Sequence, residues 1–323
     1  MFNIFISLIA ALSFIPYALA QSGDFPNKPI TIIVAYGPGG QGDTFARIVG
    51  ERLTSSYKQS VVIDNRPGVA GMIGTRIVAK SKNDGYTLLL GQTGEIAVNR
   101  VIIKGMDYDP LKDLMPVVLI GNAPLVLLAP ADASYNSLAD FIKQAKASKG
   151  GFSFGSVGAG TPGHLSAVAL ALAAGLEMTH VPYKSVGPLF ADLMAARLQL
   201  FISSASAAIP QIKGGKLKAI AVTTPVRMSS LPQVPTVQEV IGQPFSYTLW
   251  GGLFAPAGTP PAVIQSLNKE VNSILAQSEI RAKFEADNLN VPANSPLDFS
   301  KYVQTEVIKF ERLVRDANLK IEP

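Results

Sequence analysis

Two glycine-rich stretches carry the residues whose types and spacing could bind a ligand. Their sequences are Gly37-Pro38-Gly39-Gly40-Gln41-Gly42 and Gly158-Ala159-Gly160-Thr161-Pro162-Gly163. Each follows an apolar run typical of a strand, at 31–36 and 152–157, and precedes a run typical of a helix. Such a loop leaves free backbone N–H groups at a helix N-terminus, and these attract negative charge. Our central hypothesis is that the two loops face each other and hold one anionic ligand from both sides.

Both loops also match the pattern G-x-G-x-x-G, the fingerprint of dinucleotide-binding folds. Asp64, just after the apolar run 61–63, stands about where such folds place a ribose-binding acid. Two residues disfavour this interpretation, because Asp43 puts a carboxylate where a pyrophosphate must lie and Pro38 lacks an N–H group. A Rossmann-type NAD-binding oxidoreductase using the Gly37–Gly42 loop is therefore kept as the alternative function, beside ordinary turns that bind no ligand.

The sequence holds no set of residues that is typical of catalysis. The stretch Gly151–Gly155 matches G-x-S-x-G, but a nucleophile elbow needs its serine on a sharp turn, and Ser153 lies inside a predicted strand. The chain has no cysteine and only two histidines, His164 and His180, which excludes thiolate chemistry and disfavours a histidine metal site. We therefore predict a binding protein with no catalytic residue, no metal site and no cofactor.

Several polar residues near the loops have both a structural and a ligand-binding interpretation. Asp43 could cap the helix that follows it or contact the ligand, and Thr161 presents the same two alternatives. His164 could bond to the backbone in the first turn of its helix, or it could donate to a ligand carboxylate. His180 lies on a short predicted strand and is interpreted as structural.

Other polar groups end predicted strands where they could line the same cleft. The sequence Gly91-Gln92-Thr93-Gly94 closes the strand predicted at 86–90, at the edge where α/β sheets bind ligands. Tyr183 and Lys184 follow the strand predicted at 178–181, although a solvated lysine is the commoner case.

The composition favours two domains of ordinary size and a small acidic ligand. A chain of 323 residues suits two domains, and 48% hydrophobic residues are ample for their cores. The net charge of +5 is spread along the chain without a block of Lys and Arg. This distribution disfavours nucleic acid as a partner and is compatible with acidic small molecules.

The first twenty residues are typical of a secretory signal peptide. Phe2–Phe14 is almost wholly apolar, Pro16 interrupts it, and Ala18-Leu19-Ala20 forms an A-x-A cleavage signal, although the start lacks Lys and Arg. We predict export to the periplasm with cleavage after Ala20. Because an exported NAD enzyme would find little cofactor, this prediction also disfavours the dinucleotide alternative.

The rest of the chain alternates strands and helices, which predicts parallel sheets covered on both faces. The run 117–128 is interpreted as one strand leaving a first lobe and another entering a second, and 245–255 returns the chain. Thr259 is predicted to cap a C-terminal helix that has Pro260 at its first position. The result is an α/β fold of two lobes, residues 24–122 plus 251–323 and residues 123–250, joined by two crossing hinge strands around a ligand cleft.

Several short motifs, in order along the chain, resemble those of one protein family. The ordered set resembles the Bug family, the periplasmic solute receptors of tripartite tricarboxylate transporters. The motifs are Pro29-Ile30-Thr31 with Gly37-Pro38-Gly39-Gly40, Asn65-Arg66-Pro67-Gly68, Asp84-Gly85-Tyr86-Thr87, His180-Val181-Pro182-Tyr183-Lys184, Gly215-Lys216-Leu217, Ala221-Val222-Thr223 and the run from Leu253 to Pro261.

The resemblance implies a type II, Venus-flytrap periplasmic binding protein whose two glycine loops, at 36–43 and 156–164, pinch one carboxylate of a small organic ligand. It implies a membrane transporter or a sensor as the downstream partner, and we expect a monomer that binds no nucleic acid. Carried over to this chain, the ligand-binding residues are Tyr36, Pro38, Gly39, Gly40, Gln41, Asp43, Gln92, Thr93, Ser156, Gly158, Ala159, Gly160, Thr161, His164, Tyr183, Lys184 and Ser203.

Two positions depart from the family pattern. The family often has glycine where Ser185 stands, and an acid where Ser203 stands at the end of the strand predicted at 198–202. A neutral Ser203 removes a cleft anion that could match a ligand's ammonium group. The departure therefore favours dicarboxylates or aromatic carboxylates over amino acids.

Overall fold

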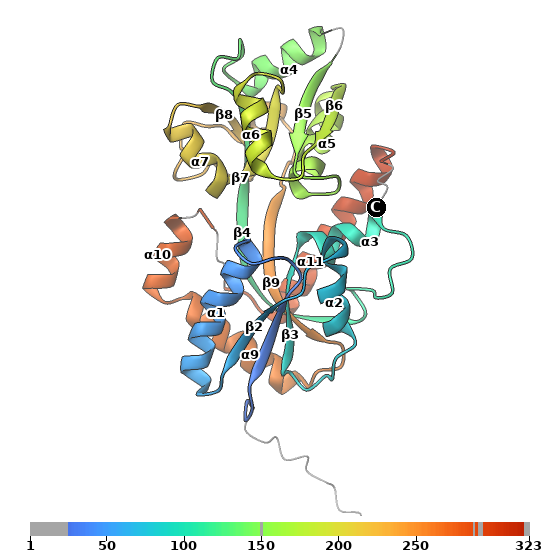
Figure 1. Cartoon of the computed structure of the whole chain (residues 1–323), viewed down its shortest axis with the longest axis vertical. Helices are drawn as coiled ribbons and strands as arrows, with labels where there is room; N and C mark the ends of the chain where they lie inside the picture. The colour runs from blue at the N-terminus through green and yellow to red at the C-terminus, as the bar shows by residue number, and fades with distance from the viewer. Residues whose placement is uncertain (1–24, 149–150, 287, 290–292, 320–323) are drawn as a thin grey trace, which may run out of the picture.

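The computed structural model describes residues 25–148, 151–286, 288–289 and 293–319, so the predicted signal peptide and its cleavage site lie outside the described residues. The chain forms two lobes stacked along the long axis of the molecule (Figure 1). One path of strands, in the order β2-β1-β3-β9-β4-β7-β5-β6, runs through both lobes, and β8 pairs with β4. The predicted α/β fold of two lobes with two crossing strands is confirmed.

The sheet of the first lobe has three parallel strands, and β9 and β4 add antiparallel pairs to it. Alternate residues of its first strand serve opposite faces: Ile30, Ile32 and Val34 pack toward α1 and α9, whereas Ile33 packs toward the other face. The elements are β1 (Ile30–Val34), α1 (Gln41–Tyr57), β2 (Val61–Asn65), η1 (Val69–Gly71), α2 (Met72–Ala79), β3 (Thr87–Gln92), the π-helix η2 (Gly94–Val98), α3 (Asn99–Ile102), α9 (Pro261–Leu275), α10 (Ser278–Ala286) and α11 (Pro296–Asp316).

The second lobe repeats the arrangement with its own sheet. Strand β5 pairs in parallel with β6 and β7, while β7 and β8 run antiparallel to β4. Ser137 caps α4, because its hydroxyl accepts a hydrogen bond from the Asp140 N–H. The elements are α4 (Leu138–Ala147), β5 (Phe152–Ser156), α5 (Pro162–Ala174), β6 (Met178–Pro182), α6 (Val186–Met194), β7 (Leu200–Ser204), α7 (Ala205–Lys213), β8 (Leu217–Val222) and α8 (Val237–Ile241).

Two long strands, β4 (Leu114–Pro130) and β9 (Thr248–Pro256), connect the lobes and pair with each other where they cross. The expectation of two separate strands within 117–128 is wrong, because β4 is continuous. The register of its pairing with β9 shifts between Pro116 and Val118 and between Leu119 and Gly121, and the pairing continues beyond each shift. The predicted lobe boundaries, at 122/123 and 250/251, fall inside these two strands.

The C-terminal helices pack on the first lobe. Ile264, Leu267 and Val271 of α9 are buried as one stripe of the helix. The predicted cap of α9 is wrong: Pro260 occupies the N-cap position, and the Thr259 hydroxyl instead donates to the Pro256 carbonyl at 2.7 Å. The hydroxyl closes the turn that follows β9, so it is not available to the helix.

Candidate ligand-binding site

The first glycine loop, between β1 and α1, is held in place by the carboxylate of Asp43. Gly40 stands at the N-cap without a side-chain cap, and Gly39, with φ at 84°, donates its N–H to Asp43 Oδ2 at 2.9 Å. Arg47 Nε donates to the same oxygen at 2.9 Å, and Asn65 Nδ2 donates to Oδ1 at 3.1 Å. Asp43 is therefore not the N-cap. It lies at the third helical position and reaches back to the loop.

The electrostatics of this loop combine a buried acid with an exposed base. The hydrogen bond from Arg47 is the largest of the effects that lower the pKa of Asp43 below its usual value. Asp43 is only 4% exposed, whereas the Arg47 side chain is 55% exposed. The charge of the acid is thus compensated within the loop, and the N–H groups of the first helical turn have no partner inside α1.

The second loop, between β5 and α5, is held in place by an imidazole. Thr161 is the N-cap, and Gly160, with φ at 76°, donates its N–H to His164 Nδ1 at 3.1 Å. The Thr161 hydroxyl donates to the Gly158 carbonyl at 2.7 Å. Ser156 Oγ lies 2.6 Å from His180 Nε2 and accepts the Gly158 N–H at 3.1 Å. Of the two interpretations of His164, the bond to the backbone is the one this geometry contains.

The two histidine rings lie in contact inside the second lobe. Their centroids are 4.1 Å apart, and both rings stack on Phe154. Burial, with a smaller effect from His180, lowers the pKa of His164 to about 4, and burial also lowers the pKa of His180. His164 is therefore neutral at neutral pH, with an unprotonated Nδ1 that can accept the loop N–H.

The remaining predicted residues differ in how available their polar groups are. Thr93 is fully buried, and its hydroxyl accepts the Trp250 N–H at 3.0 Å. The Tyr183 hydroxyl donates to Asp192 at 2.6 Å, whereas Lys184 is exposed. Ser203 is buried on β7, and Gln92 is half-buried at the end of β3. The Tyr36 hydroxyl donates to the Ala70 carbonyl at 3.3 Å. The other predicted ligand-binding residues include Pro38 in the first loop and Ala159 in the second.

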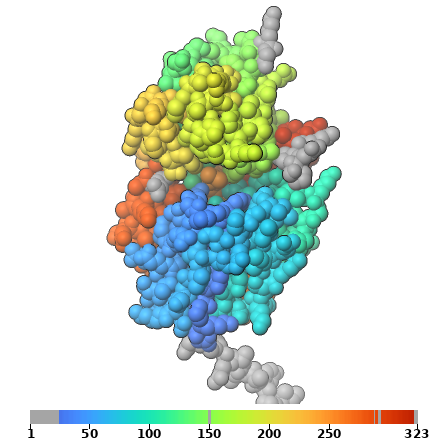
Figure 2. All heavy atoms as spheres, viewed as in Figure 1, coloured from blue at the N-terminus to red at the C-terminus, as the bar shows by residue number. Residues whose placement is uncertain are grey.

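The crossing strands bring the two loops to the same part of the hinge. Gln41 Nε2 donates to the Leu249 carbonyl on β9 at 3.2 Å, and Leu249 pairs with Ala123 on β4. The second loop packs on the end of β7, where Ser204 pairs with Leu125 of β4. Figure 1 shows the loop before α1 at the top of the first lobe and the loop before α5 at the bottom of the second. In Figure 2 the two lobes meet along an indented boundary.

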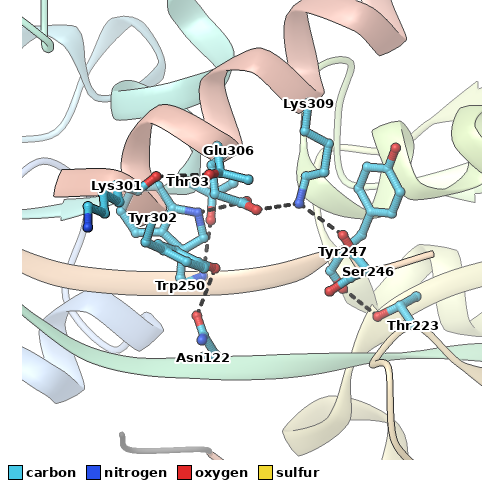
Figure 3. Close-up of polar contacts among 11 residues, drawn as sticks. Thr93, Asn122, Thr223, Ser246, Tyr247, Trp250, Lys301, Tyr302, Glu306 and Lys309 are labelled. Atoms are coloured by element: carbon cyan, nitrogen blue, oxygen red, sulfur yellow. Dashed lines mark hydrogen bonds and ion pairs between the residues drawn. The ribbon is translucent and has the colours of Figure 1, made fainter. Parts of the chain in front are cut away.

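Side chains of helix α11 form hydrogen bonds with the hinge strands and the segment before β9 (Figure 3). Trp250 Nε1 donates to the buried carboxylate of Glu306 at 3.1 Å, and Lys309 Nζ donates to the Ser246 carbonyl at 2.9 Å. The Tyr302 hydroxyl donates to Asn122 on the other crossing strand at 3.1 Å. Thr93 and Gln41 bond to adjacent residues of β9, so the site and α11 contact the same strand.

Two hollows of about 810 and 440 Å³ flank the hinge, and neither is lined by a residue of the glycine loops. We therefore assign the candidate site to the boundary between the lobes and not to either hollow. In the described residues, no group of three or more His, Asp or Glu side chains could hold a metal ion. No helix in the described part of the chain has the length and apolar character needed to cross a bilayer.

Sequence reasoning missed two residues that lie near the first loop, Asn65 and Glu95. Asn65 belongs to one of the family-like motifs, but nothing in the sequence indicates that its amide bonds to both Asp43 and the Tyr36 carbonyl. Glu95 follows the polar residues that end β3 and is fully buried. The one feature of the sequence that indicates burial of Glu95 is the apolar run 96–98 that follows this acid directly.

Comparisons with known proteins agree with this architecture. The family model described as tripartite tricarboxylate transporter family receptor matches residues 45–319. Protein BugT of Bordetella pertussis (strain Tohama I) is 33% identical over 306 residues, which cover 94% of each chain. The solved structure of R. palustris Rpa4515 with adipate is 34% identical, has a TM-score of 0.80, and matches 91% of this chain and 99% of its own. MatC from Rhodopseudomonas palustris, with bound malate, is 29% identical, has a TM-score of 0.76, and matches 90% of this chain and 100% of its own.

Proposed function

Because the chain belongs to the tripartite tricarboxylate transporter receptor family, the Bug family of periplasmic solute-binding receptors, we propose that it captures a small organic carboxylate between its two glycine loops. Receptors of this family bind solutes and are not enzymes. The observation that supports the proposal best is the pair of loops at one part of the hinge, each followed by a helix N-terminus. Relatives with bound adipate and malate support a carboxylate as the ligand.

The proposed mechanism is capture followed by closure of the lobes. A carboxylate that bridges the two helix N-termini interacts with donors from both lobes at once, and that interaction is complete only when the lobes are close. The ligand can shift the protein toward the closed form only by its differential affinity for that form. The closed lobes then present a surface to a transporter of the tripartite tricarboxylate type, or to a sensor.

The proposed site consists of the two loops with Gln92, Thr93, Tyr183, Lys184 and Ser203 beside them. Asp43 and His164 act in it by holding the loops, through their bonds to Gly39 and Gly160. The neutral Ser203 favours dicarboxylates or aromatic carboxylates over amino acids. A screen in which glutamate or aspartate binds most tightly would contradict that preference.

The first test is a calorimetric and thermal-shift screen of the mature protein, freed of co-purified ligand. It includes adipate, malate, tricarboxylates, aromatic carboxylates, amino acids and NAD. A ligand at a hundred times its dissociation constant adds about 2.7 kcal/mol to the free energy of unfolding, which is easily detected. Binding of carboxylates supports the proposal, whereas binding of NAD alone would replace it with the dinucleotide alternative.

A substitution at Gly40 tests whether the first loop is the site. Gly40 has φ at −78°, and a Cβ there would meet only the Gly37 carbonyl at 3.8 Å, so Gly40→Gln leaves the fold intact. We expect at least a tenfold loss of carboxylate affinity with an unchanged unfolding midpoint. Gly187→Gln, in open space on the second lobe, is the matched control. Equal affinities for the two variants would exclude the loop as the site.

We also propose that the protein is exported and cleaved after Ala20, and that it acts as a monomer. The periplasmic location of the family supports export. The intact mass of the protein recovered from the periplasm gives the cleavage site, and sedimentation with and without adipate gives the oligomeric state.

A further inference from the structure

A buried acid, Glu95, lies just behind the first loop. It follows β3 in the π-helix η2 and has no exposed surface. Its Oε1 accepts the Gln92 N–H at 2.7 Å, whereas its Oε2 has no hydrogen-bond partner among the described residues. The Gln92 N–H occupies one oxygen of this carboxyl group, and the Tyr36 phenol is the polar side chain that acts on the acid.

A short chain of contacts connects Glu95 to the first loop. A Cβ on Gly71 would lie 3.1 Å from both Glu95 Cβ and the Tyr36 ring, so the acid and the phenol pack side by side. The Tyr36 carbonyl accepts a hydrogen bond from Asn65 Nδ2 at 3.0 Å, and the same nitrogen donates to Asp43 at 3.1 Å. Two side chains therefore separate Glu95 from the group that holds Gly39.

No base pairs with Glu95 in the described part of the chain. Burial raises its pKa to about 8, and burial, with smaller effects from Glu95, raises the pKa of Tyr36, so both groups are neutral at pH 7. The charged and titratable side chains on the elements around it have other partners. These are Tyr108 (to the Glu95 carbonyl), Arg76 and Lys80 (to Asp107), Arg100 (to Asp109 and Glu311), Glu306 (to Trp250 and Lys309), Tyr302 (to Asn122) and Asp43 (to Arg47).

We propose that Glu95 is a proton-binding site whose occupancy is linked to carboxylate capture. This inference rests on the proposed function. The neutral acid lets an anion sit at the first loop, and the ionised acid opposes it, because two like charges repel through a weakly screened interior. Linkage is reciprocal, so the bound carboxylate must strengthen the binding of the proton to Glu95. Capture then takes up protons at mildly alkaline pH.

Calorimetry of the mature protein with adipate and with malate, from pH 6.5 to 9.5, tests this inference. Both probes are ionised over the compared range from pH 7 to 9.5, and burial lowers the pKa of both histidines away from that range. We expect affinity to fall about sevenfold from pH 7 to pH 9.5, the change produced when the bound carboxylate raises the pKa of Glu95, about 8 in the free protein, by one unit. Titrations in two buffers of different ionisation enthalpy are expected to show an uptake of about half a proton near pH 8.5.

Glu95→Gln removes the titrating group and keeps the size and the acceptor for the Gln92 N–H. We expect this variant to bind with the affinity that the native protein has at pH 7, without proton uptake and with a flat pH profile. Glu51→Gln, which removes an exposed acid from the same lobe, is expected to behave like the native protein. Native protein that binds carboxylate without pH dependence or proton uptake overturns this inference alone. Absence of carboxylate binding at every pH overturns the proposed function as well.

Discussion

The two glycine loops are held by the same kind of hydrogen bond, but the side chain that accepts it differs between the lobes. In each, a glycine with positive φ precedes the N-cap and donates its N–H to a side chain at the third helical position, at 2.9 Å in the first loop and 3.1 Å in the second. The acceptor is a carboxylate paired with an exposed arginine in one lobe, and a neutral imidazole stacked on a second imidazole in the other. Both arrangements fix the loop without leaving an uncompensated negative charge beside the donors.

The comparison extends to the second helical position, and there we expect the largest effect. A Cβ on Gly163 would lie 2.4 Å from the Ile202 carbonyl, which belongs to the backbone of β7, whereas a Cβ on Gly42 would meet the side chains of Gln92 and Leu90. Side chains can move, but a strand backbone cannot. Gly163→Ala is therefore expected to lower the free energy of unfolding by about 3 kcal/mol, and Gly42→Ala by about 1 kcal/mol.

Urea unfolding of the two variants checks this difference. Equal losses would mean that the two loops are packed alike and that the comparison fails at this position. Carboxylate binding separates them further, because the side chain that must move in Gly42→Ala, Gln92, belongs to the proposed site.

Acid should distinguish the loops next. The folded protein lowers the pKa of His164 to about 4, so the unfolded chain takes up a proton first as the pH falls below about 6.5. The stabilisation is fully present above that pH and is lost as the pH falls toward 4. By this linkage the native protein loses about 2 kcal/mol of unfolding free energy from His164 between pH 8 and pH 5.

His164→Asn isolates this contribution, because Asn Oδ1 can accept the Gly160 N–H in place of Nδ1 and does not titrate in this range. Unfolding midpoints in urea at pH 8 and pH 5 are expected to fall less for the variant than for the native protein. Parallel decreases in the two proteins would contradict the prediction. Asp43 keeps its charge over this range because its pKa is lowered, so the first loop is expected to be insensitive.

The sequence predicted where the loops are but not what holds them. The repeat of strand, glycine loop and helix could be predicted, because each of these elements is determined by residues adjacent in the sequence. The bond from Gln41 to Leu249 joins residues 208 positions apart, and no local pattern indicates it. The run 117–128 was interpreted as two strands, yet cross-strand pairing with β9 keeps β4 continuous through Gly121 and Pro124. The burial of Glu95 depends on η1 and on the loop of Tyr108, which reach it only in the folded lobe.

Arg47 has no counterpart in the second loop, and removing it gives the smallest expected effect. Its side chain is 55% exposed, and Asp43 keeps the hydrogen bonds from the Gly39 N–H and the Asn65 amide, so Arg47→Gln should move the thermal midpoint by no more than about 1 °C. The variant leaves the charge of Asp43 uncompensated beside the proposed anion site. We therefore expect about a threefold loss of carboxylate affinity, larger at low salt, where charges are screened less. Arg52→Gln removes the same charge from the same helix, where the arginine pairs with Glu279, and serves as the control. If both variants lose affinity equally, the net charge of the protein, and not the ion pair with Asp43, affects carboxylate affinity at the first loop.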